Sequence, residues 1–404
     1  MLCLKEVCYS LDQYMSEKPA TILVIDDEVD LLRSITAYLE DSGFIAISAE
    51  NGKAAIEIIN QNKPDLILTD LHMPVLGGLE VLHTVTKELP DIPVIVISGA
   101  GQLNDAVESL RLGAWDYITK PIADLQALEH AIKKALERKR LLEQNRIYAQ
   151  RLEHNLKILE EDQAAGRQVQ VTLLPPQLVK FSNFEFRFKI IPSLELSGDF
   201  VEYFAIDDDN VAVYLADVSG HGASSAFLTI LLKGMIAKYN FQYHSQQGTT
   251  ILQPHKLMQA ISNEFFTAKL GKYLTLVYGV LNIQTGSFTY GIAGHYPNPI
   301  RYLQNGTTQF LIGSGFPIGI MANVNYEEQT LQLLPGEHLV IFSDGVMEVF
   351  MHGENLTQKE AALLQVIQES AGDIAKIWRA TGVTTTTNVA HPDDITILVI
   401  SHNP

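Results

Sequence analysis

TILVI at residues 21–25 is the first of five short β-rich runs, and the others are FIAIS at 44–48, DLILT at 65–69, IPVIVIS at 92–98 and AWDYI at 114–118. Amphipathic stretches of helical length separate these runs. Strands that alternate with helices are typical of a parallel sheet covered by helices on both faces. The sequence therefore predicts a doubly wound α/β domain with a five-stranded parallel sheet over residues 20–123.

Polar side chains stand where four of these predicted strands end. Asp26 and Asp27 follow the first strand, Asp70 follows the third, Ser98 follows the fourth and Lys120 follows the fifth. Open α/β sheets bind ligands at the carboxyl ends of their strands, so we expect these side chains to lie together. Three carboxylates that repel one another favour a hard divalent cation, most naturally Mg²⁺. Each aspartate alone is more often a turn or cap residue, so the prediction depends on their joint occurrence.

Four motifs in this region resemble those of the receiver domain of bacterial two-component response regulators: VIDDE at 24–28, TDLHMPVLGG at 69–78, ISGA at 97–100 and DYITKP at 116–121. The resemblance implies that Asp70 accepts a phosphoryl group from a histidine kinase or phosphotransfer protein and carries it as an acyl phosphate. It also implies Mg²⁺ bound by Asp27, Asp70 and the backbone carbonyl of His72, with support from Asp26.

The same resemblance assigns three residues to the response that follows phosphorylation. Lys120 would pair with the phosphoryl oxygens. Ser98 would follow the phosphoryl group, and Tyr117 would then rotate inward. In this way a local change of charge would alter the surface of the domain.

Composition limits what the whole chain can do. The 404 residues contain 29 Lys and Arg against 47 Asp and Glu, a formal charge of −18, which argues against nucleic-acid binding. The two cysteines, Cys3 and Cys8, cannot build a disulfide framework or a zinc site in the body of the chain. Apolar runs are too short to span a membrane and the start does not resemble a signal peptide, so we expect a cytoplasmic protein with a tail at residues 1–19.

A long helix is predicted after the first domain. Residues 124–165 contain no Gly or Pro, and Leu142, Leu152, Leu156 and Leu159 recur at helical spacing. Gly166 predicts the end of this helix, so we place a helical, coiled-coil-like linker at 124–168. The apolar stripe favours a homodimer. A basic cluster within 133–140 is better explained as a solvated face that pairs with acidic neighbours than as a nucleic-acid patch.

The last part of the chain, residues 169–404, is rich in strands. Its strand-like runs are FEFRFKII at 184–191, VAVYLADV at 211–218, YLTLVYGVL at 273–281, SFTYGIA at 287–293, HLVIFS at 338–343 and ITILVI at 395–400. Helical patterns are clearest at 223–240 and 254–269. Successive strands with helices grouped between them predict an α+β sandwich.

Acidic residues again stand near the ends of predicted strands: Asp199 in SGDF, Asp217 in ADVSGHG, Asp344 in FSDG, and Asp393 with Asp394 in HPDDIT. An all-oxygen site of this kind suits Mg²⁺ or Mn²⁺ and not zinc. An isolated Asp-Gly pair is more often a tight turn, and the metal hypothesis depends on the repetition of the pattern across the domain.

These motifs resemble the metal-dependent type 2C (PPM) protein phosphatases, in particular their SpoIIE/RsbU-like branch. The likeness also includes QVTLLPPQL at 170–178, AGHYPNP at 293–299, GFPIGI at 315–320 and LLPGEHLVIFSDGVMEV at 333–349. It implies an αββα sandwich with two Mg²⁺ or Mn²⁺ ions that activate water for attack on a phosphoserine or phosphothreonine. Asp217 would bridge both ions, and Asp199, Asp344, Asp393 and the backbone carbonyl of Val218 would complete the site.

Three further residues, Glu202, His221 and His295, are candidates for this site. The branch often has a second aspartate three residues after the first ligand, where this chain has Glu202, and we expect the retained charge to preserve activity. His221 and His295 are candidates to donate a proton to the leaving oxygen. Histidines in Gly-rich turns are more often structural, so we do not assign either a catalytic role.

The sequence thus predicts a response regulator whose effector is a metal-dependent protein serine/threonine phosphatase. By resemblance, the substrate is a phosphorylated anti-sigma-factor antagonist, a STAS-domain protein of a partner-switching pathway. The alternative is an adaptor in which the phosphatase-like domain binds a partner without turnover. Retention of all four aspartates favours the enzyme, since an adaptor has no chemical need for them.

Overall fold

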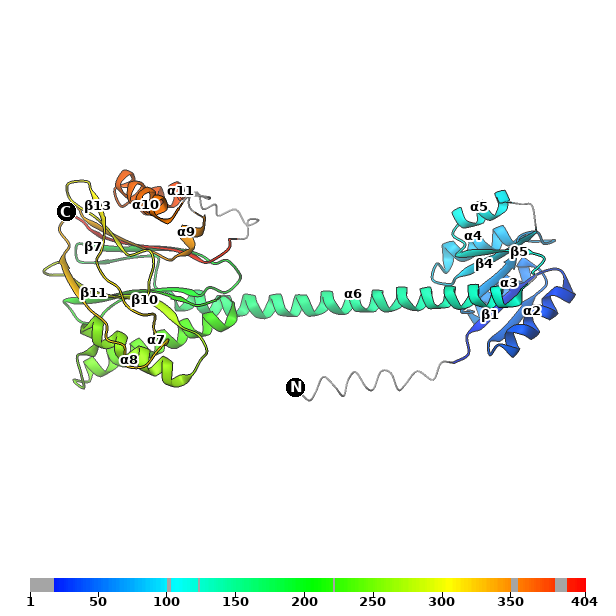
Figure 1. The fold of residues 1–404 in the computed structure, drawn as a ribbon, viewed down its shortest axis with the longest axis horizontal. Coiled ribbons are helices and arrows are strands. Elements are labelled where there is room, and N and C mark those ends of the chain that lie inside the picture. The colour runs from blue at the N-terminus through cyan, green and yellow to red at the C-terminus, as the bar shows by residue number, and fades with distance from the viewer. Residues whose placement is uncertain (1–17, 100–102, 123, 221, 350–354, 382–390) are drawn as a thin grey trace. The chain divides into compact units, whose positions relative to one another are not determined.

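A five-stranded parallel sheet organises the first part of the chain, with the strand order β2-β1-β3-β4-β5 (Figure 1). Its strands are β1 (Thr21–Ile25), β2 (Ile45–Ala49), β3 (Leu66–Asp70), β4 (Val94–Gly99) and β5 (Asp116–Lys120). Helices α2 (Val29–Asp41), α3 (Gly52–Asn62), α4 (Gly78–Glu88) and α5 (Leu103–Arg111) connect them. All five predicted strands and the doubly wound class are confirmed.

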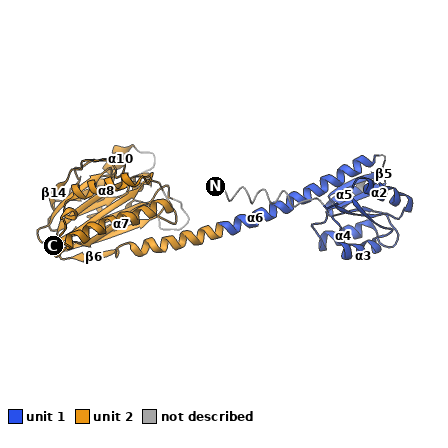
Figure 2. Cartoon of the chain, turned by 90° about the horizontal axis from the view of Figure 1, so that it is seen from below, with its two compact units in different colours: residues 1–155 blue, residues 156–404 orange. Residues whose placement is uncertain are grey.

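The computed structural model describes residues 18–99, 103–122, 124–220, 222–349, 355–381 and 391–404. The predictions for the N-terminal tail, both cysteines and His221 lie outside the described residues. The chain divides into two compact units, residues 1–155 and 156–404 (Figure 2).

Alternation along the strands gives the first unit two cores, one on each face of the sheet. Leu23 and Ile67 pack against α3 and α4 on one face. Val24 and Leu68 pack on the other face against α2 and against Leu128, which lies in the first turn of helix α6 (Leu125–Leu173). Because the central strands β1, β3 and β4 are buried on both faces, they appear in the sequence as nearly continuous apolar runs.

Helix α6 is longer than predicted. Its 49 residues continue past Gly166 to Leu173, so the predicted end at 166–168 is wrong. Gly166 packs against Leu196, where an added Cβ would lie 3.4 Å from a leucine methyl. The side chain of Gln170, one turn later, is buried. These contacts within the second unit outweigh the low helix propensity of a single glycine.

Two antiparallel sheets form the second unit. One has the order β14-β11-β10-β9-β8 and the other β13-β12-β15-β16-β7-β6. Their strands are β6 (Leu178–Phe181), β7 (Phe184–Ile191), β8 (Asp199–Ala205), β9 (Asn210–Val218), β10 (Leu274–Asn282), β11 (Ser287–Ala293), β12 (Ile300–Tyr302), β13 (Thr308–Phe310), β14 (Gln329–Gln332), β15 (His338–Phe342) and β16 (Ile395–His402). The helices are α7 (Ala223–His244), the 3-10 helix η1 (Thr250–Leu252), α8 (Pro254–Ala268), α9 (Gly345–Val349), α10 (Leu356–Ser370) and α11 (Ile374–Ala380).

The elements of this unit form four layers in the order helices, sheet, sheet, helices, and an apolar core lies between each pair of adjacent layers. Phe186 and Leu215 belong to the layer between the two sheets. Helices α7 and α8 cover the outer face of the first sheet, and α10 and α11 cover that of the second. The predicted αββα sandwich is confirmed, as are the predicted helices at 223–240 and 254–269.

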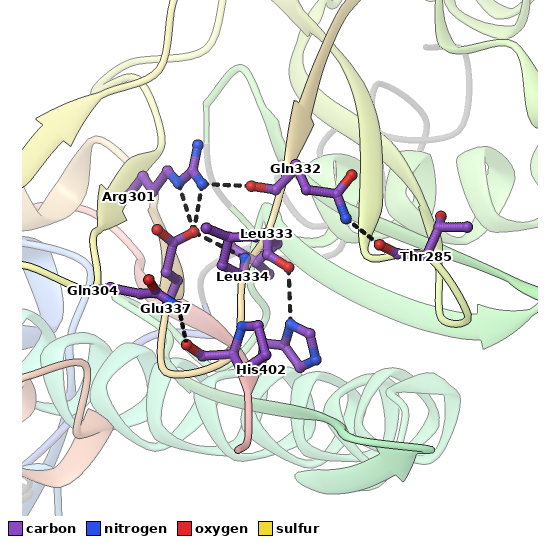
Figure 3. Close-up of polar contacts among 9 residues, drawn as sticks. Thr285, Arg301, Gln304, Gln332, Leu333, Leu334, Glu337 and His402 are labelled. Carbon is purple, nitrogen blue, oxygen red and sulfur yellow. Dashed lines mark hydrogen bonds and ion pairs between the residues drawn. The ribbon is translucent and has the colours of Figure 1, made fainter.

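A buried ion pair closes the end of the sandwich at which β15 begins (Figure 3). The Glu337 carboxylate, 2% exposed, accepts hydrogen bonds from Nε of Arg301 at 3.0 Å and from the backbone N–H of Leu334 at 3.0 Å. Arg301 also donates to the carbonyl of Gln332, and His402 Nδ1 contacts the carbonyl of Leu333 at 2.8 Å. These bonds fasten the connection between β14 and β15 to the end of β16.

Across the described residues, we find no helix that combines the length and the apolar character needed to cross a membrane.

Candidate functional site

Acidic side chains gather at the carboxyl edge of the parallel sheet, as the sequence predicts. Oxygen atoms of Asp26, Asp27 and Asp70 all lie within 4.8 Å of one another. Asp26 follows β1 directly and Asp70 is the last residue of β3, and these two strands are neighbours. We call these three aspartates, together with Lys120, the first acidic site.

Lys120 supplies the positive charge of this site. Its Nζ lies 2.7 Å from Oδ2 of Asp70, 2.8 Å from Oδ2 of Asp26 and 3.9 Å from Oε1 of Glu28. Burial acts to lower the pKa of Lys120, but the hydrogen bonds to Asp26 and Asp70 outweigh it and raise that pKa above its ordinary value. The lysine is therefore held in its charged form beside the carboxylates.

The remaining residues predicted for this edge lie around the aspartates. Ser98, on β4, is buried, and Tyr117, on β5, is 36% exposed. The backbone N–H of His72 donates to Oδ1 of Asp70 at 3.5 Å, and its ring contacts Asp105 of α5 at 2.8 Å. The imidazole of His72 is thus paired with Asp105, and the metal role predicted for this residue concerns only its backbone carbonyl.

A second group of aspartates lies at one end of the sandwich. Asp199, at the start of β8, pairs in register with Asp217, near the end of β9. Asp344 follows β15, and Asp393 stands just before β16, which pairs with β15. We call these four aspartates the second acidic site.

Two glycines allow the segments of this site to approach one another. A Cβ at Gly345 would lie only 2.0 Å from the carbonyl oxygen of Asp394. A Cβ at Gly198 would lie 3.0 Å from the carbonyl oxygen of Val218, the predicted backbone ligand. Only glycine fits at the first position, because any side chain would separate the segments that carry Asp344 and Asp393.

The electrostatics of the second acidic site differ from those of the first. Burial and the charges of Asp217 and Asp394 raise the pKa of Asp199 well above its usual range. Burial and the charges of Asp344 and Asp393 raise the pKa of Asp217 to about 7. Burial and the charge of Asp393 raise the pKa of Asp344 to about 6. In the part of the chain that is described, no lysine or arginine lowers the pKa of these three aspartates.

Such a donor set fits divalent cations. Carboxylate oxygens are the ligands of Mg²⁺ and Mn²⁺, and buried carboxylates without a counter-charge are costly unless a cation joins them. Among the described residues, no three members of the second acidic site lie within 4.8 Å of one another, unlike the first.

Sequence reasoning missed the part played by Asp394. Its Oδ2 accepts hydrogen bonds from the backbone N–H of Gly198 at 2.5 Å and from Oγ of Ser197 at 3.0 Å. Its Oδ1 accepts from the backbone N–H of Ser193 at 2.6 Å. Asp393, by contrast, is only partly buried, and its charge acts on Asp217. The two adjacent aspartates therefore have different roles: Asp394 binds the 193–198 loop, whereas Asp393 belongs to the second acidic site.

Glu202 does not serve as a further acidic residue of this site. Along β8, residues three apart lie on opposite faces, so Glu202 points away from the face that carries Asp199. Its buried carboxylate forms an ion pair with Lys233 of α7. Glu202 therefore lies outside the second acidic site, and its charge stabilises the contact between β8 and α7. The expectation that activity survives with glutamate at this position stays a prediction.

His295 is a structural residue. Its ring is 4% exposed, its Nε2 lies 2.7 Å from the carbonyl oxygen of Phe342, and its Nδ1 lies 3.2 Å from Oγ1 of Thr275. Burial lowers the pKa of His295 to about 4, so the ring is neutral at physiological pH. A neutral histidine with both nitrogens engaged matches the structural role favoured from the sequence.

The two parts of the chain match two family models. The model "Response regulator receiver domain" matches residues 22–133, and the model "Stage II sporulation protein E (SpoIIE)" matches residues 207–403. The protein is therefore a response regulator in which a receiver domain precedes a phosphatase-family effector. More particularly, the effector is a SpoIIE domain, which belongs to the PPM phosphatase family.

Individual relatives cover different parts of the chain. The chain is 36% identical over 123 residues to the transcriptional regulatory protein GlrR of Escherichia coli K12, which is 30% of this chain and 28% of that protein. It is 22% identical over 306 residues to the Regulator of RpoS of the same organism, which is 75% of this chain and 88% of that protein. The chain thus spans less than a third of GlrR.

Among solved structures, the RsbU and RsbW domains of Rv1364c from Mycobacterium tuberculosis are similar to the chain, with 19% identity and a TM-score of 0.46. The match covers 55% of this chain and 60% of that one. A receiver domain protein from Clostridium thermocellum is 37% identical, with a TM-score of 0.30, and covers 30% of this chain and 98% of that one.

Proposed function

We propose that the protein is a metal-dependent protein serine/threonine phosphatase controlled by phosphorylation of its receiver domain. One observation carries the proposal: four aspartates gather at one end of the sandwich, and no described lysine or arginine lowers the pKa of Asp199, Asp217 or Asp344. We take residues 20–123 as the receiver domain and 169–404 as the phosphatase domain, joined by α6.

In the receiver domain, Asp70 accepts a phosphoryl group from a cognate histidine kinase or phosphotransfer protein. Asp27, Asp70 and the backbone carbonyl of His72 hold Mg²⁺, with Asp26 in support. Lys120 already contacts Asp70 at 2.7 Å, which places its charge where the phosphoryl oxygens would be. Tyr117, which is exposed in this structure, rotates inward once Ser98 follows the phosphoryl group.

In the phosphatase domain, Asp199, Asp217, Asp344, Asp393 and the carbonyl of Val218 hold two Mg²⁺ or Mn²⁺ ions. Such ions, when bound, offset the charge of the substrate phosphate and activate water for attack on phosphorus. Burial and the neighbouring carboxylates raise the pKa of Asp217 to about 7, so protons compete with cations for this carboxylate as the pH falls below neutral. We therefore expect cation affinity to fall as the pH drops below neutral.

The substrate we propose is a phosphorylated anti-sigma-factor antagonist, a STAS-domain protein. The motifs shared with the SpoIIE/RsbU-like branch support this assignment, because the metal ligands themselves do not select a substrate. We further propose that the protein is a homodimer through α6, where Leu142, Leu152, Leu156 and Leu159 are each at least half exposed.

Hydrolysis of a phosphoserine peptide with Mn²⁺ tests the proposal. The intact protein is compared with Asp217→Asn and with Asp70→Asn, each with and without a small-molecule phosphoryl donor. We expect turnover that requires Asp217 and that responds to the donor only when Asp70 is present. If Asp217→Asn retains full activity, or if no turnover is seen, the protein is better described as an adaptor.

A further inference from the structure

The last turns of α6 hold the second unit through one buried amide. Gln170 is 5% exposed. Its Nε2 donates to the carbonyl oxygen of Ser197 at 2.7 Å, and its Oε1 accepts from the backbone N–H of the same residue at 3.1 Å. One side chain thus satisfies both backbone groups of a residue that lies two positions before Asp199.

Ser197 extends this contact toward the second acidic site. Its Oγ donates to Oδ2 of Asp394 at 3.0 Å and accepts from the backbone N–H of Asp199 at 3.1 Å. All four side chains, Gln170, Ser197, Asp394 and Asp199, are at most 5% exposed. Because these groups are buried, a polar group that loses its hydrogen-bond partner has no water to replace it. The position of each group in this network therefore depends on that of its neighbour.

The helix end is held at a second point, on the other side of Asp199. Nζ of Lys233 donates to the carbonyl oxygen of Leu173, the last residue of α6, at 2.8 Å. The same ammonium group is the partner of Glu202, three residues after Asp199. The two contacts of the helix end therefore reach the chain on both sides of Asp199. One is at Ser197, just before β8, and the other reaches Glu202, within β8, through Lys233.

We propose that Gln170, acting through Ser197 and Asp394, is a positioning residue for Asp199, so that docking of the α6 end and cation binding at the second acidic site favour each other. This inference rests on the proposed function, in which Asp199 binds a cation. Residues that orient metal ligands typically change metal affinity by about 10- to 100-fold when they are replaced. Because linkage is reciprocal, a bound cation should in turn stabilise the helix end.

The test uses the full chain with Asp27→Asn and Asp70→Asn, which disable the first acidic site. Into this background we place Gln170→Met, which keeps the length of the side chain but removes both hydrogen bonds. Gln168→Met is the matched control, since Gln168 lies on the same helix and is exposed. Ser197→Ala, a milder change that leaves the backbone bonds to Gln170 intact, serves if Gln170→Met does not fold.

Two measurements are made on each variant: the dissociation constant of Mn²⁺, and backbone hydrogen exchange with and without a chelator. We expect Gln170→Met to weaken Mn²⁺ binding about 10- to 100-fold and to speed exchange at residues 197–201 in chelator. Gln168→Met should change neither quantity. In the parent protein, Mn²⁺ should slow exchange at residues 168–173, and Gln170→Met should abolish this effect.

A purely structural role gives a different result. If Gln170→Met lowers the melting temperature but binds Mn²⁺ as tightly as the parent, the inference is overturned and the proposed function stands. If the parent binds no Mn²⁺, or if Asp217→Asn does not alter its binding, the proposed function fails and the linkage with it. If Gln170→Met does not fold and Ser197→Ala leaves both Mn²⁺ affinity and exchange unchanged, the inference is overturned as well.

Discussion

Gly345→Ala is expected to damage the second acidic site more than its size suggests. The added Cβ would lie 2.0 Å from the carbonyl oxygen of Asp394, whereas ordinary contacts begin near 3.4 Å. The segment that carries Asp344 must therefore move by about 1.4 Å relative to Asp393, and displacements of about 1 Å in catalytic groups cost about 100-fold in rate. We predict a fall of about 100-fold in kcat/KM for p-nitrophenyl phosphate with Mn²⁺.

Gly234→Ala is the matched control for this prediction. Gly234 lies on the exposed side of α7, and no atom lies within 4 Å of the position that its Cβ would take. Alanine there should stabilise the protein by about 1 kcal/mol through helix propensity and leave the rate unchanged. Thermal unfolding of both variants separates loss of fold from loss of geometry. Activity of Gly345→Ala within about twofold of the parent would refute the claim that this close approach sets the site.

Three more predictions concern other parts of the molecule. Burial lowers the pKa of His295 to about 4, so between about pH 7 and about pH 5 the histidine binds a proton in the unfolded state but not in the folded state. The free energy of unfolding should therefore fall by about 2 kcal/mol over this range. Chemical denaturation of His295→Gln at the two pH values should lack this decrease. Arg301→Met leaves the buried Glu337 without its ion-pair partner and should lower the free energy of unfolding, measured with denaturant, by about 3–5 kcal/mol. The kcat below the melting temperature should not change, because this ion pair lies at the opposite end of β15 from Asp344. Lys120→Met should abolish the response of phosphatase activity to a phosphoryl donor while basal activity persists, and a response equal to that of the parent would exclude Lys120 from the switch.

The sequence predicted best where burial imposes a regular pattern. Strands β1, β3 and β4 were predicted because they are apolar on both faces, and the aspartates at the ends of β1 and β3 follow from the geometry of a parallel sheet. The edge strands β2 and β5 are partly exposed and were predicted from their β-rich composition. The core strands β7, β9, β10, β11, β15 and β16 were predicted because most of their residues are apolar. Strand β8 was missed, and so were the short strands β6, β12, β13 and β14, which carry too weak a signal.

Functions that depend on contacts between distant segments could not be read from the chain. Asp393 and Asp394 are adjacent and chemically identical, and only the position of the 193–198 loop distinguishes the residue that faces the site from the residue that holds the loop. Gln170 lies between the exposed Val169 and Val171 near the predicted end of a helix, where nothing local marks the glutamine as the buried residue. The position of Glu202 outside the second acidic site could not be predicted, because a three-residue spacing places side chains on opposite faces only in a strand, and β8 was not predicted.

The two acidic sites use the same residue type, but their charge balance differs, and under the proposed function this difference bears on how many cations each would bind. In the first, Lys120 offsets one of three carboxylates, so a single divalent ion would neutralise the rest and leave the lysine to meet a phosphoryl group. In the second, the four aspartates have no basic partner among the described residues, and the charge of Asp394 is met by N–H and O–H donors. In the proposed phosphatase, two divalent ions would balance these four aspartates, and the substrate phosphate would then enter a neutral site instead of a repulsive one. Chelation should accordingly abolish substrate binding as well as turnover, which equilibrium dialysis of a phosphoserine peptide with Asp217→Asn as the reference can measure.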